Sequence, residues 1–419
     1  MILKFISKLL SVILIAVLFS SLFAIGVFAA PEQGESSNNN LRVLIQPLNK
    51  NDKSKLMSTY GARWDFESKG FTTNVNEQQY TALLKNKNLK ISIVDTVSIA
   101  AKPKAGGEVV PSDRTPWGIE AIYNDPLIAS TDGGDNIRVA VLDTGTNINH
   151  TDLQANVEQC KDFSQNKSPL INGSCADKNG HGTHVAGTVL ANGGNGTGIY
   201  GVAPDAKLWA YRVLGNSGFG YSDDIAAAIR HAADEGKKNG VKVVISMSLG
   251  SSSKDSLIAD AVTYAVNSGA LVVAAAGNEG PAPNTIGFPG GLHDAIAVAA
   301  LENVLQNGSY RIADFSSRGN PSTAGDFVIG ERDVELSAPG RAIESTWSDG
   351  TYNTISGTSM ATPHISGLAA KIWAENPSMT NYQIRAELQN RAKSNDIKAG
   401  QYAGAGDDIA SGFGFPLVK

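Results

Sequence analysis

The chain has 419 residues, of which 42% are hydrophobic and 18% are charged, and its formal net charge is −5. These values exclude fibrous and intrinsically disordered proteins and leave enough apolar material for a large buried core.

The first 30 residues have the layout of a secretory signal peptide. Lys4 and Lys8 precede an uncharged apolar run from Leu9 to Phe28, and Ala29 and Ala30 offer small residues for cleavage. We therefore expect a secreted, extracellular protein with no membrane association after signal removal. The apolar run is also long enough for an uncleaved membrane anchor, which stays open as the alternative, whereas no later segment is.

Residues 31–110 predict a small α+β domain followed by an exposed linker. Leu41–Ile45 and Lys90–Val94 alternate as strands do, whereas Glu77–Leu84 has helical spacing. Lys102–Glu108 contains Pro, Gly and Lys and is typical of a linker. This part has 11 Lys and Arg against 8 Asp and Glu, a net charge of +3.

From residue 111 onward, apolar runs alternate with helical patterns, which predicts an α/β fold with a doubly wound, mostly parallel central sheet. The expected elements are strand 137–143, a helix from 181, strand 208–214, helix 223–235, strand 241–249, helix 256–267, strands 271–276 and 295–301, short strands between 312 and 355, a helix from 359 and helix 381–392. This part has 22 Lys and Arg against 32 Asp and Glu. Its net charge of −10 argues against nucleic acid as a partner.

Gly357-Thr-Ser-Met-Ala-Thr-Pro-His364 runs into a small-residue apolar segment, so Ser359 stands at the start of a predicted buried helix. The N–H groups and the positive dipole end of a helix can stabilise an oxyanion that forms beside a nucleophilic hydroxyl. Taken alone, the motif is equally consistent with an ordinary helix N-cap.

Two upstream stretches supply what a serine nucleophile needs. Asn179-Gly-His-Gly-Thr-His184 places His181 at a second helix start. The β-branched run Ile137–Asp143 delivers a carboxylate at the carboxyl end of a strand, where open α/β sheets hold their ligand-facing groups. Asp, His and Ser follow one another in an order that occurs among serine peptidases.

These motifs resemble those of the subtilase family of serine endopeptidases, and the bacterial subtilisins in particular. The resemblance is carried by four blocks in order within residues 111–419: Asp143-Thr-Gly, His181-Gly-Thr-His, Ala276-Gly-Asn278 and Gly357-Thr-Ser359-Met-Ala-Thr-Pro. It implies a self-processing precursor of an enzyme that hydrolyses peptide bonds in proteins and peptides with broad specificity.

The residues predict nucleophilic catalysis in which Ser359 attacks the peptide carbonyl, His181 takes and returns the proton, and Asp143 holds the imidazole. Asp152 and Asp177 compete for the carboxylate role. Only Asp143 ends a β-branched strand beside a glycine that allows a tight turn.

The resemblance implies that the Asn278 side chain donates to the oxyanion together with the N–H of Ser359. An asparagine in a turn after a strand is the alternative. His181 and His184 have the i, i+3 spacing of a metal site, but no third ligand or general-base Glu accompanies them. We expect His184 to be structural.

The resemblance also implies that an extended peptide substrate lies between two backbone edges. One edge is formed by Ser248, Leu249 and Gly250, and the other by Gly218 and Gly220. The walls of the pocket for the residue before the cut are implied at Ala275, Gly277, Gly287 and Gly290, with Glu279 at its rim.

Gly196-Thr-Gly-Ile-Tyr-Gly201 matches the dinucleotide pattern G-x-G-x-x-G, but it follows a helix and precedes a strand, the reverse of the required context. In subtilisins this loop binds structural calcium. The resemblance therefore implies calcium as a cofactor, with Asp152, Asn195, Thr197 and Ile199 as ligands. The loop departs from the family pattern by one extra residue.

Cys160 and Cys175 are the only two cysteines, and both follow the predicted secretion signal. They predict a disulfide, with a pair of free thiols as the alternative. A bridge here resembles the cold-active branch of the subtilisins.

By the same resemblance, residues 31–110 are a propeptide that aids folding, inhibits the enzyme as an intramolecular partner and is removed by self-cleavage. Residues 111–419 are then the catalytic domain, expected to act as a monomer. The opposite net charges of the two parts favour their association, although unrelated domains can also differ in charge.

Two other functions compete with this prediction. A non-catalytic binding or storage protein on the same fold is disfavoured because Asp143, His181, Ser359 and Asn278 are all present. An α/β-hydrolase esterase is disfavoured because Gly357-Thr-Ser-Met-Ala361 lacks the second glycine of the nucleophile elbow.

Overall fold

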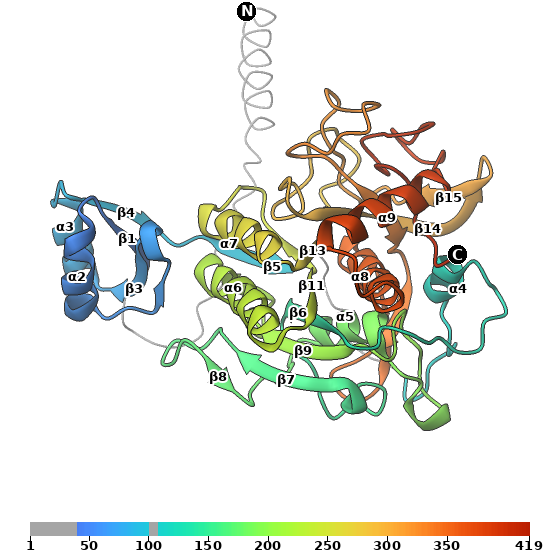
Figure 1. Cartoon of the computed structure of the whole chain (residues 1–419), viewed down its shortest axis with the longest axis horizontal. Helices are drawn as coiled ribbons and strands as arrows, with labels where there is room; N and C mark the ends of the chain where they lie inside the picture. Colours follow the sequence, from blue (N-terminus) through green and yellow to red (C-terminus); the bar gives the residue numbers. More distant parts are fainter. Residues whose placement is uncertain (1–39, 100–107) are drawn as a thin grey trace, which may run out of the picture. The chain divides into compact units, whose positions relative to one another are not determined.

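The computed structural model describes residues 40–99 and 108–419 (Figure 1). The predicted signal peptide and most of the predicted linker lie outside these ranges. Within them, no helix combines the length and the apolar character needed to cross a membrane.

Residues 41–93 form the small α+β domain that the sequence predicts. An antiparallel sheet in the order β2-β3-β1-β4 carries two helices. Its elements are β1 (Leu41–Pro47), α2 (Lys53–Tyr60), β2 (Trp64–Asp65), β3 (Phe71–Val75), α3 (Glu77–Leu84) and β4 (Leu89–Ile93). Val43, Ile45 and Phe71 are fully buried between the sheet and the helices. The helix at Glu77–Leu84 is confirmed, and α2 was not predicted.

The large sheet has the order β15-β14-β13-β11-β6-β9-β7-β8, and β16 also pairs with β14. All neighbours are parallel except β14–β15 and β7–β8. The strands are β6 (Ile137–Asp143), β7 (Val157–Asp162), β8 (Ile171–Asn172), β9 (Lys207–Arg212), β11 (Lys242–Met247), β13 (Leu271–Ala275), β14 (Ile296–Gln306), β15 (Ser309–Ile312) and β16 (Leu336–Pro339). The predicted mostly parallel sheet is confirmed.

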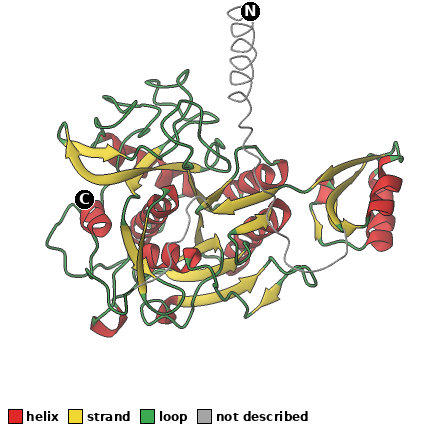
Figure 2. Ribbon diagram, turned by 180° about the vertical axis from the view of Figure 1, so that it is seen from behind, coloured by secondary structure: helices red, strands yellow, loops and turns green. Residues whose placement is uncertain are grey.

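Helices cover both faces of this sheet (Figures 1 and 2). They are α4 (Trp117–Tyr123), α5 (His181–Leu190), α6 (Ser222–Asn239), α7 (Ser256–Asn267), α8 (Thr358–Glu375) and α9 (Asn381–Lys393). Strand β6 shows why both faces must be covered. Val139 and Val141 pack in the cluster that contains α5 and α8, whereas Ala140 and Leu142 pack in the cluster that contains α6 and α7. Because each face of β6 is apolar, the doubly wound arrangement buries both.

Two smaller sheets complete the described chain. β5 (Thr96–Ile99) lies between β10 (Phe219–Tyr221) and β12 (Leu249–Gly250), antiparallel to both. β17 (Ile343–Thr346) and β18 (Tyr352–Ile355) form a hairpin. The single strand expected over 241–249 is thus two strands, because β11 belongs to the large sheet and β12 turns away to pair with β5.

A disulfide joins Cys160, on β7, to Cys175, with the two Cα atoms 5.2 Å apart. The sequence predicted this bridge, and it is confirmed. It closes a polar loop with a sequence separation of 15 residues. Beyond the loop, Asp177 accepts hydrogen bonds from the backbone at the start of α5.

Replacing both cysteines by serine is expected to lower the free energy of unfolding by about 3 kcal/mol, because the unfolded chain regains the entropy of the open loop. The measurement is urea unfolding of the two proteins, each of which also carries Ser359→Ala to remove the expected nucleophile. An unchanged urea midpoint in the double variant would contradict the expectation.

Candidate active site

The candidate residues converge because three neighbouring parallel strands end at one edge of the sheet. Asp143 is the last residue of β6, Ser248 directly follows β11, and Asn278 follows β13 by three residues. In the sheet order, β6, β11 and β13 are adjacent. Parallel strands present their carboxyl ends together, so side chains 135 residues apart in sequence meet at this edge.

Asp143 and His181 form the first contact of the site. His181 Nδ1 lies 2.8 Å from Asp143 Oδ1, which also accepts from the backbone N–H of Thr144 at 2.7 Å. Both side chains are buried. Since an ionised carboxylate only accepts, this contact selects the tautomer with the proton on Nδ1. His181 Nε2 is buried and has no hydrogen-bond partner among the described residues, so its lone pair is available to take a proton.

Local sequence holds this pair together. Gly182 follows His181 at the start of α5, and a Cβ there would stand 2.1 Å from the backbone oxygen of Gly145 and 3.2 Å from Asp143 Oδ1. Only glycine permits the approach of α5 to the end of β6. Asp177 adds a clamp, because its carboxylate accepts from Gly180 N at 2.9 Å and from Thr144 Oγ1 at 3.0 Å.

Asp177, one of the two competitors for the carboxylate role, is thus committed to other contacts. Asp177 also accepts from the backbone and hydroxyl of Thr183, at 3.0 and 2.7 Å. It therefore acts as a cap of α5 and a tie to β6. The sequence analysis did not predict this role, although an acidic residue shortly before a helix start is a common capping pattern.

Ser359 is the second residue of α8 and is fully buried. Its hydroxyl donates to the Ser248 carbonyl at 3.1 Å, and the Ser248 hydroxyl donates back to the Ser359 carbonyl at 2.7 Å. The described residues show no hydrogen bond between Ser359 Oγ and His181 Nε2. In this structure the Ser359 hydroxyl is directed at the Ser248 carbonyl instead.

Asn278 is oriented by the residue that precedes the serine. Its Oδ1 accepts from the backbone N–H of Thr358 at 2.9 Å and from the Thr358 hydroxyl at 3.0 Å. A backbone N–H can only donate, so the contact identifies the oxygen end of the amide. The NH₂ group is then the donor end of Asn278 beside the start of α8. Thr358 is a second residue that the sequence reasoning did not single out.

The two predicted backbone edges of a substrate cleft lie on either side of β5. Gly220 pairs with Val97 on one side, and Gly250 pairs with Ser98 on the other. Gly218 accepts from Ile99 N at 2.9 Å through its carbonyl, and a Cβ on Gly218 would come within 2.8 Å of the Ile99 side chain. Residues 96–99 thus lie between the two predicted edges, and Leu249 lies opposite Ile99.

The residues named as pocket walls lie against one another. Gly287 N donates to Ala276 O at 2.9 Å, and a Cβ on Gly290 would stand 2.4 Å from the backbone oxygen of Ala275. The carbonyl of Gly277 accepts from Ser317 N at 2.9 Å, and the Ser317 hydroxyl accepts from the backbone N–H of the exposed Glu279. Close backbone contacts thus bring the predicted wall residues together.

Asp152 lies beside the loop where calcium was expected. It is fully buried, and its Oδ2 accepts from Ile199 N and from the Tyr352 hydroxyl, both at 2.9 Å. The loop that carries Asn195, Thr197 and Ile199 wraps closely around it, since a Cβ on Gly194 or on Gly198 would stand 1.9 Å from Asp152 Oδ1. Asp152 Oδ1 accepts a hydrogen bond from the Thr151 hydroxyl at 3.3 Å.

Burial favours the neutral form of two further histidines, His184 and His364. Burial lowers the pKa of His184 to about 3 and the pKa of His364 to about 4. His184 Nε2 lies 2.9 Å from Ile343 O and 3.1 Å from Asn353 O. This supports the structural role expected for His184. In the described ranges, no group of three or more His, Cys, Asp or Glu side chains is arranged to hold a metal ion.

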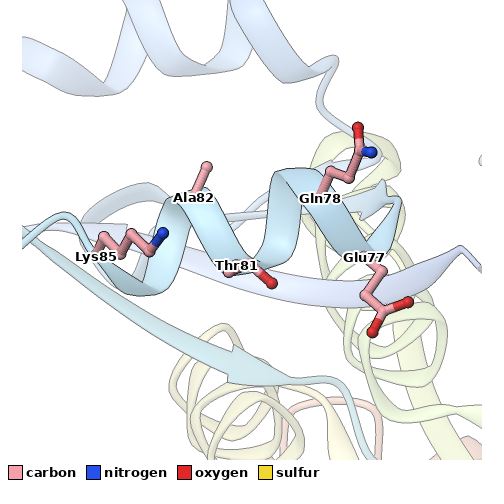
Figure 3. Close-up of a pocket in the computed structure, with 5 residues that line it drawn as sticks. All are labelled: Glu77, Gln78, Thr81, Ala82 and Lys85. Carbon is pink, nitrogen blue, oxygen red and sulfur yellow. The ribbon is translucent and has the colours of Figure 1, made fainter.

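A hollow on the surface lies elsewhere and contains none of the candidate residues. It is lined by Glu77, Gln78, Thr81 and Ala82 of α3 and by Lys85, which directly follows that helix (Figure 3). None of these side chains comes from the edge of the large sheet.

The chain was also compared with known proteins. A family model described as "Subtilase family" matches residues 134–414. A subtilisin from Bacillus sp. (strain TA39) is 58% identical over 386 residues, which are 91% of this chain and 92% of that protein. Thermitase from Thermoactinomyces vulgaris is 42% identical over 260 residues, which are 62% of this chain and 82% of that protein.

Two solved structures are similar in fold and sequence. Sphericase is 66% identical with a TM-score of 0.73, and the S41 psychrophilic protease is 62% identical with a TM-score of 0.72. Each match covers 74% of this chain and 99% of the solved one.

Proposed function

The chain belongs to the subtilase family and is a subtilisin-like serine endopeptidase, and we propose that Asp143, His181 and Ser359 are its catalytic triad and Asn278 its oxyanion donor. The observation that carries this proposal is the buried bond from His181 Nδ1 to Asp143, which leaves Nε2 as an acceptor at the edge of the sheet where α8 presents Ser359.

In the proposed mechanism, the Ser359 hydroxyl turns from the Ser248 carbonyl toward His181 Nε2. As Oγ bonds to the substrate carbonyl carbon, the hydroxyl proton passes to Nε2, and Asp143 stabilises the imidazolium. The negative charge on the former carbonyl oxygen is met by the Asn278 NH₂ group and the N–H groups at the start of α8. His181 then protonates the leaving amine, the C–N bond breaks, and water releases the acyl group by the same steps in reverse.

The first test combines labelling and turnover. A serine-directed organophosphate is expected to label Ser359 of the processed protein and to abolish proteolysis. Ser359→Ala and His181→Ala are expected to remain uncleaved precursors with kcat lowered by about 10⁶-fold, the loss established for a related subtilisin. Asn278→Leu is expected to mature slowly and to lower kcat by about 10²–10³-fold, again a magnitude taken from a subtilisin.

Peptide hydrolysis by Ser359→Ala at the wild-type rate would overturn the triad. Asn278→Asp serves as the matched control for side-chain size, because it keeps the shape and removes the donor.

We also propose that residues 31–110 are a propeptide, removed by the enzyme itself after secretion. Strand β5 supports this, since it occupies the cleft as an extended substrate would. The solved relatives add support, because 99% of each is matched by only 74% of this chain. Ile99 lies opposite Leu249, the neighbour of Ser248, whose carbonyl holds the Ser359 hydroxyl. We therefore expect self-cleavage soon after Ile99, within residues 100–110.

Two arginines attach this segment to the enzyme. Arg42 Nη1 lies 2.8 Å from Asp224 Oδ2 and 3.2 Å from Asp223 Oδ1, and Arg63 Nε lies 2.7 Å from Asp224 Oδ1. All four side chains are at most 5% exposed. A carboxylate that loses its cation in such a buried position is strongly destabilising.

Arg42→Ala with Arg63→Ala is therefore expected to weaken inhibition by the cleaved segment by at least about 100-fold. The measurement is the lag between appearance of the processed band on a gel and appearance of peptidase activity, which should shorten. Lys87→Ala with Lys90→Ala, which removes two exposed cations of the same domain, is the matched control. A lag equal to that of the control would contradict the proposed attachment.

We further propose a structural calcium ion bound by Asp152 with Asn195, Thr197 and Ile199. The donor set fits, since it combines one buried carboxylate with amide and backbone oxygens of a loop packed against it. When bound, the ion would supply stability to this loop and no chemistry at Ser359.

Adding calcium at about 100 times its dissociation constant is expected to stabilise the Ser359→Ala protein by about 2.7 kcal/mol. Thermal unfolding with calcium and with a chelator measures the shift. Asp152→Asn should lose most of it, whereas Asp125→Asn, an exposed carboxylate, should keep it. An equal melting temperature with calcium and with chelator, in the protein that keeps Asp152, would exclude the site.

A further inference from the structure

The acidic pair Asp223–Asp224 at the start of α6 has no place in the mechanism above, yet both carboxylates are buried. Residues 41–99 bury them. Arg42 binds both carboxylates, and Asp224 Oδ1 also accepts from the indole N–H of Trp64 at 2.7 Å. Removal of the N-terminal segment therefore uncovers two adjacent negative charges.

This acidic pair adjoins the end of the substrate cleft. Tyr221, the last residue of β10, lies opposite Thr96, and Ser222 N donates to Asp95 O at 2.9 Å. Asp223 follows directly. The acidic pair therefore begins one residue after Ser222, which is hydrogen-bonded to the residue just upstream of β5.

The surroundings are suited to a cationic side chain. Besides the two carboxylates, Asn166 Oδ1 accepts from the Arg42 guanidinium at 2.9 Å, and the Tyr221 ring lies under it with Cζ 3.8 Å from the ring centroid. Carboxylates, an amide oxygen and an aromatic face are the groups that bind guanidinium and ammonium ions.

We infer that, in the processed enzyme, Asp223 and Asp224 form a specificity site for a substrate arginine or lysine. The preferred residue stands at the position of Asp95, four residues before the one that takes the place of Ile99. The inference rests on the proposed function, because it requires a substrate to replace β5 in the cleft.

The backbone supports this position. Val97 packs in the apolar cluster that contains Ile225 and Ala226 of α6, and the carbonyl of Asp95 accepts from Ser222 N, the residue directly before Asp223. A substrate residue at the position of Asp95 therefore has its backbone beside the start of α6.

The precursor does not place a cation at this position of its tail. Asp95 is exposed and negative, and the folded small domain supplies the positive charge through Arg42 instead. Val94 N donates to Arg42 O at 3.0 Å, which holds the arginine beside the tail. A linear substrate has no such domain and must carry the cation in its own sequence.

Quenched-fluorescence peptides that copy residues 93–102 test the inference, with Arg, Lys, Gln or Asp at the position of Asp95. We expect processed enzyme in low salt to cleave the Arg peptide with a kcat/KM about tenfold above that of the Gln peptide, and the Asp peptide to be poorest. Mass spectrometry of the products confirms that all four are cut at one bond.

The ratio of Arg to Gln peptide should fall to about 1 in Asp223→Asn with Asp224→Asn. Asp234→Asn, on the same helix about 15 Å along its axis, should keep the ratio. If the double variant fails to mature, the wild-type enzyme still decides, since 1 M NaCl should reduce a charge-dependent ratio severalfold.

A ratio near 1 for wild-type enzyme in low salt would overturn the inference, as would a ratio that survives both the double variant and high salt. A peptide that begins at the position of Thr96 separates the two levels of the argument. If it is cleaved and the ratio is 1, only the specificity site fails, whereas no cleavage of any peptide counts against the proposed function.

Discussion

The bond between Asp143 and His181 is the contact on which the rest of the site depends. It selects the imidazole tautomer and leaves Nε2 as a buried acceptor. Two elements must meet closely for it to form, the end of β6 and the start of α5. Glycine at 182 permits that approach, and Asp177 holds it from the other side. Each of these two requirements is met by a single residue, but the geometry is strict. A single added carbon at position 182 would collide with the backbone of Gly145.

The parallel sheet explains why this small set of polar groups lies beside an otherwise apolar core. β6, β11 and β13 are buried on both faces and end together, so the residues at and just beyond their carboxyl ends can bring polar side chains together beside the core. Asp143, Ser248 and Asn278 occupy those ends. α8 then completes the edge, with Thr358 orienting Asn278 and Ser359 exchanging hydrogen bonds with Ser248.

The same edge is covered in this form of the chain. β5 lies between the two predicted substrate edges, and the small domain that precedes it is attached through Arg42 and Arg63 to the start of α6. In the functions proposed above, the start of α6 binds the N-terminal segment in the precursor and borders the substrate after that segment is removed. Asp223 and Asp224 then act in both states, first as partners of Arg42 and Arg63 and later beside the upstream part of a substrate.

By itself, the sequence determined the fold class, the order of the main strands and helices, the disulfide and the identity of the candidate triad. These follow from local pattern, since two-sided apolar runs, helix starts and short glycine-bounded motifs are readable residue by residue. Tertiary structure decided the rest. It split the expected strand at 241–249, made Asp177 a clamp instead of a triad member, gave Thr358 its hold on Asn278 and paired Arg42 with carboxylates 181 and 182 residues away. No local sequence pattern encodes such partners, because they depend on which strand ends and helix starts the packing brings together.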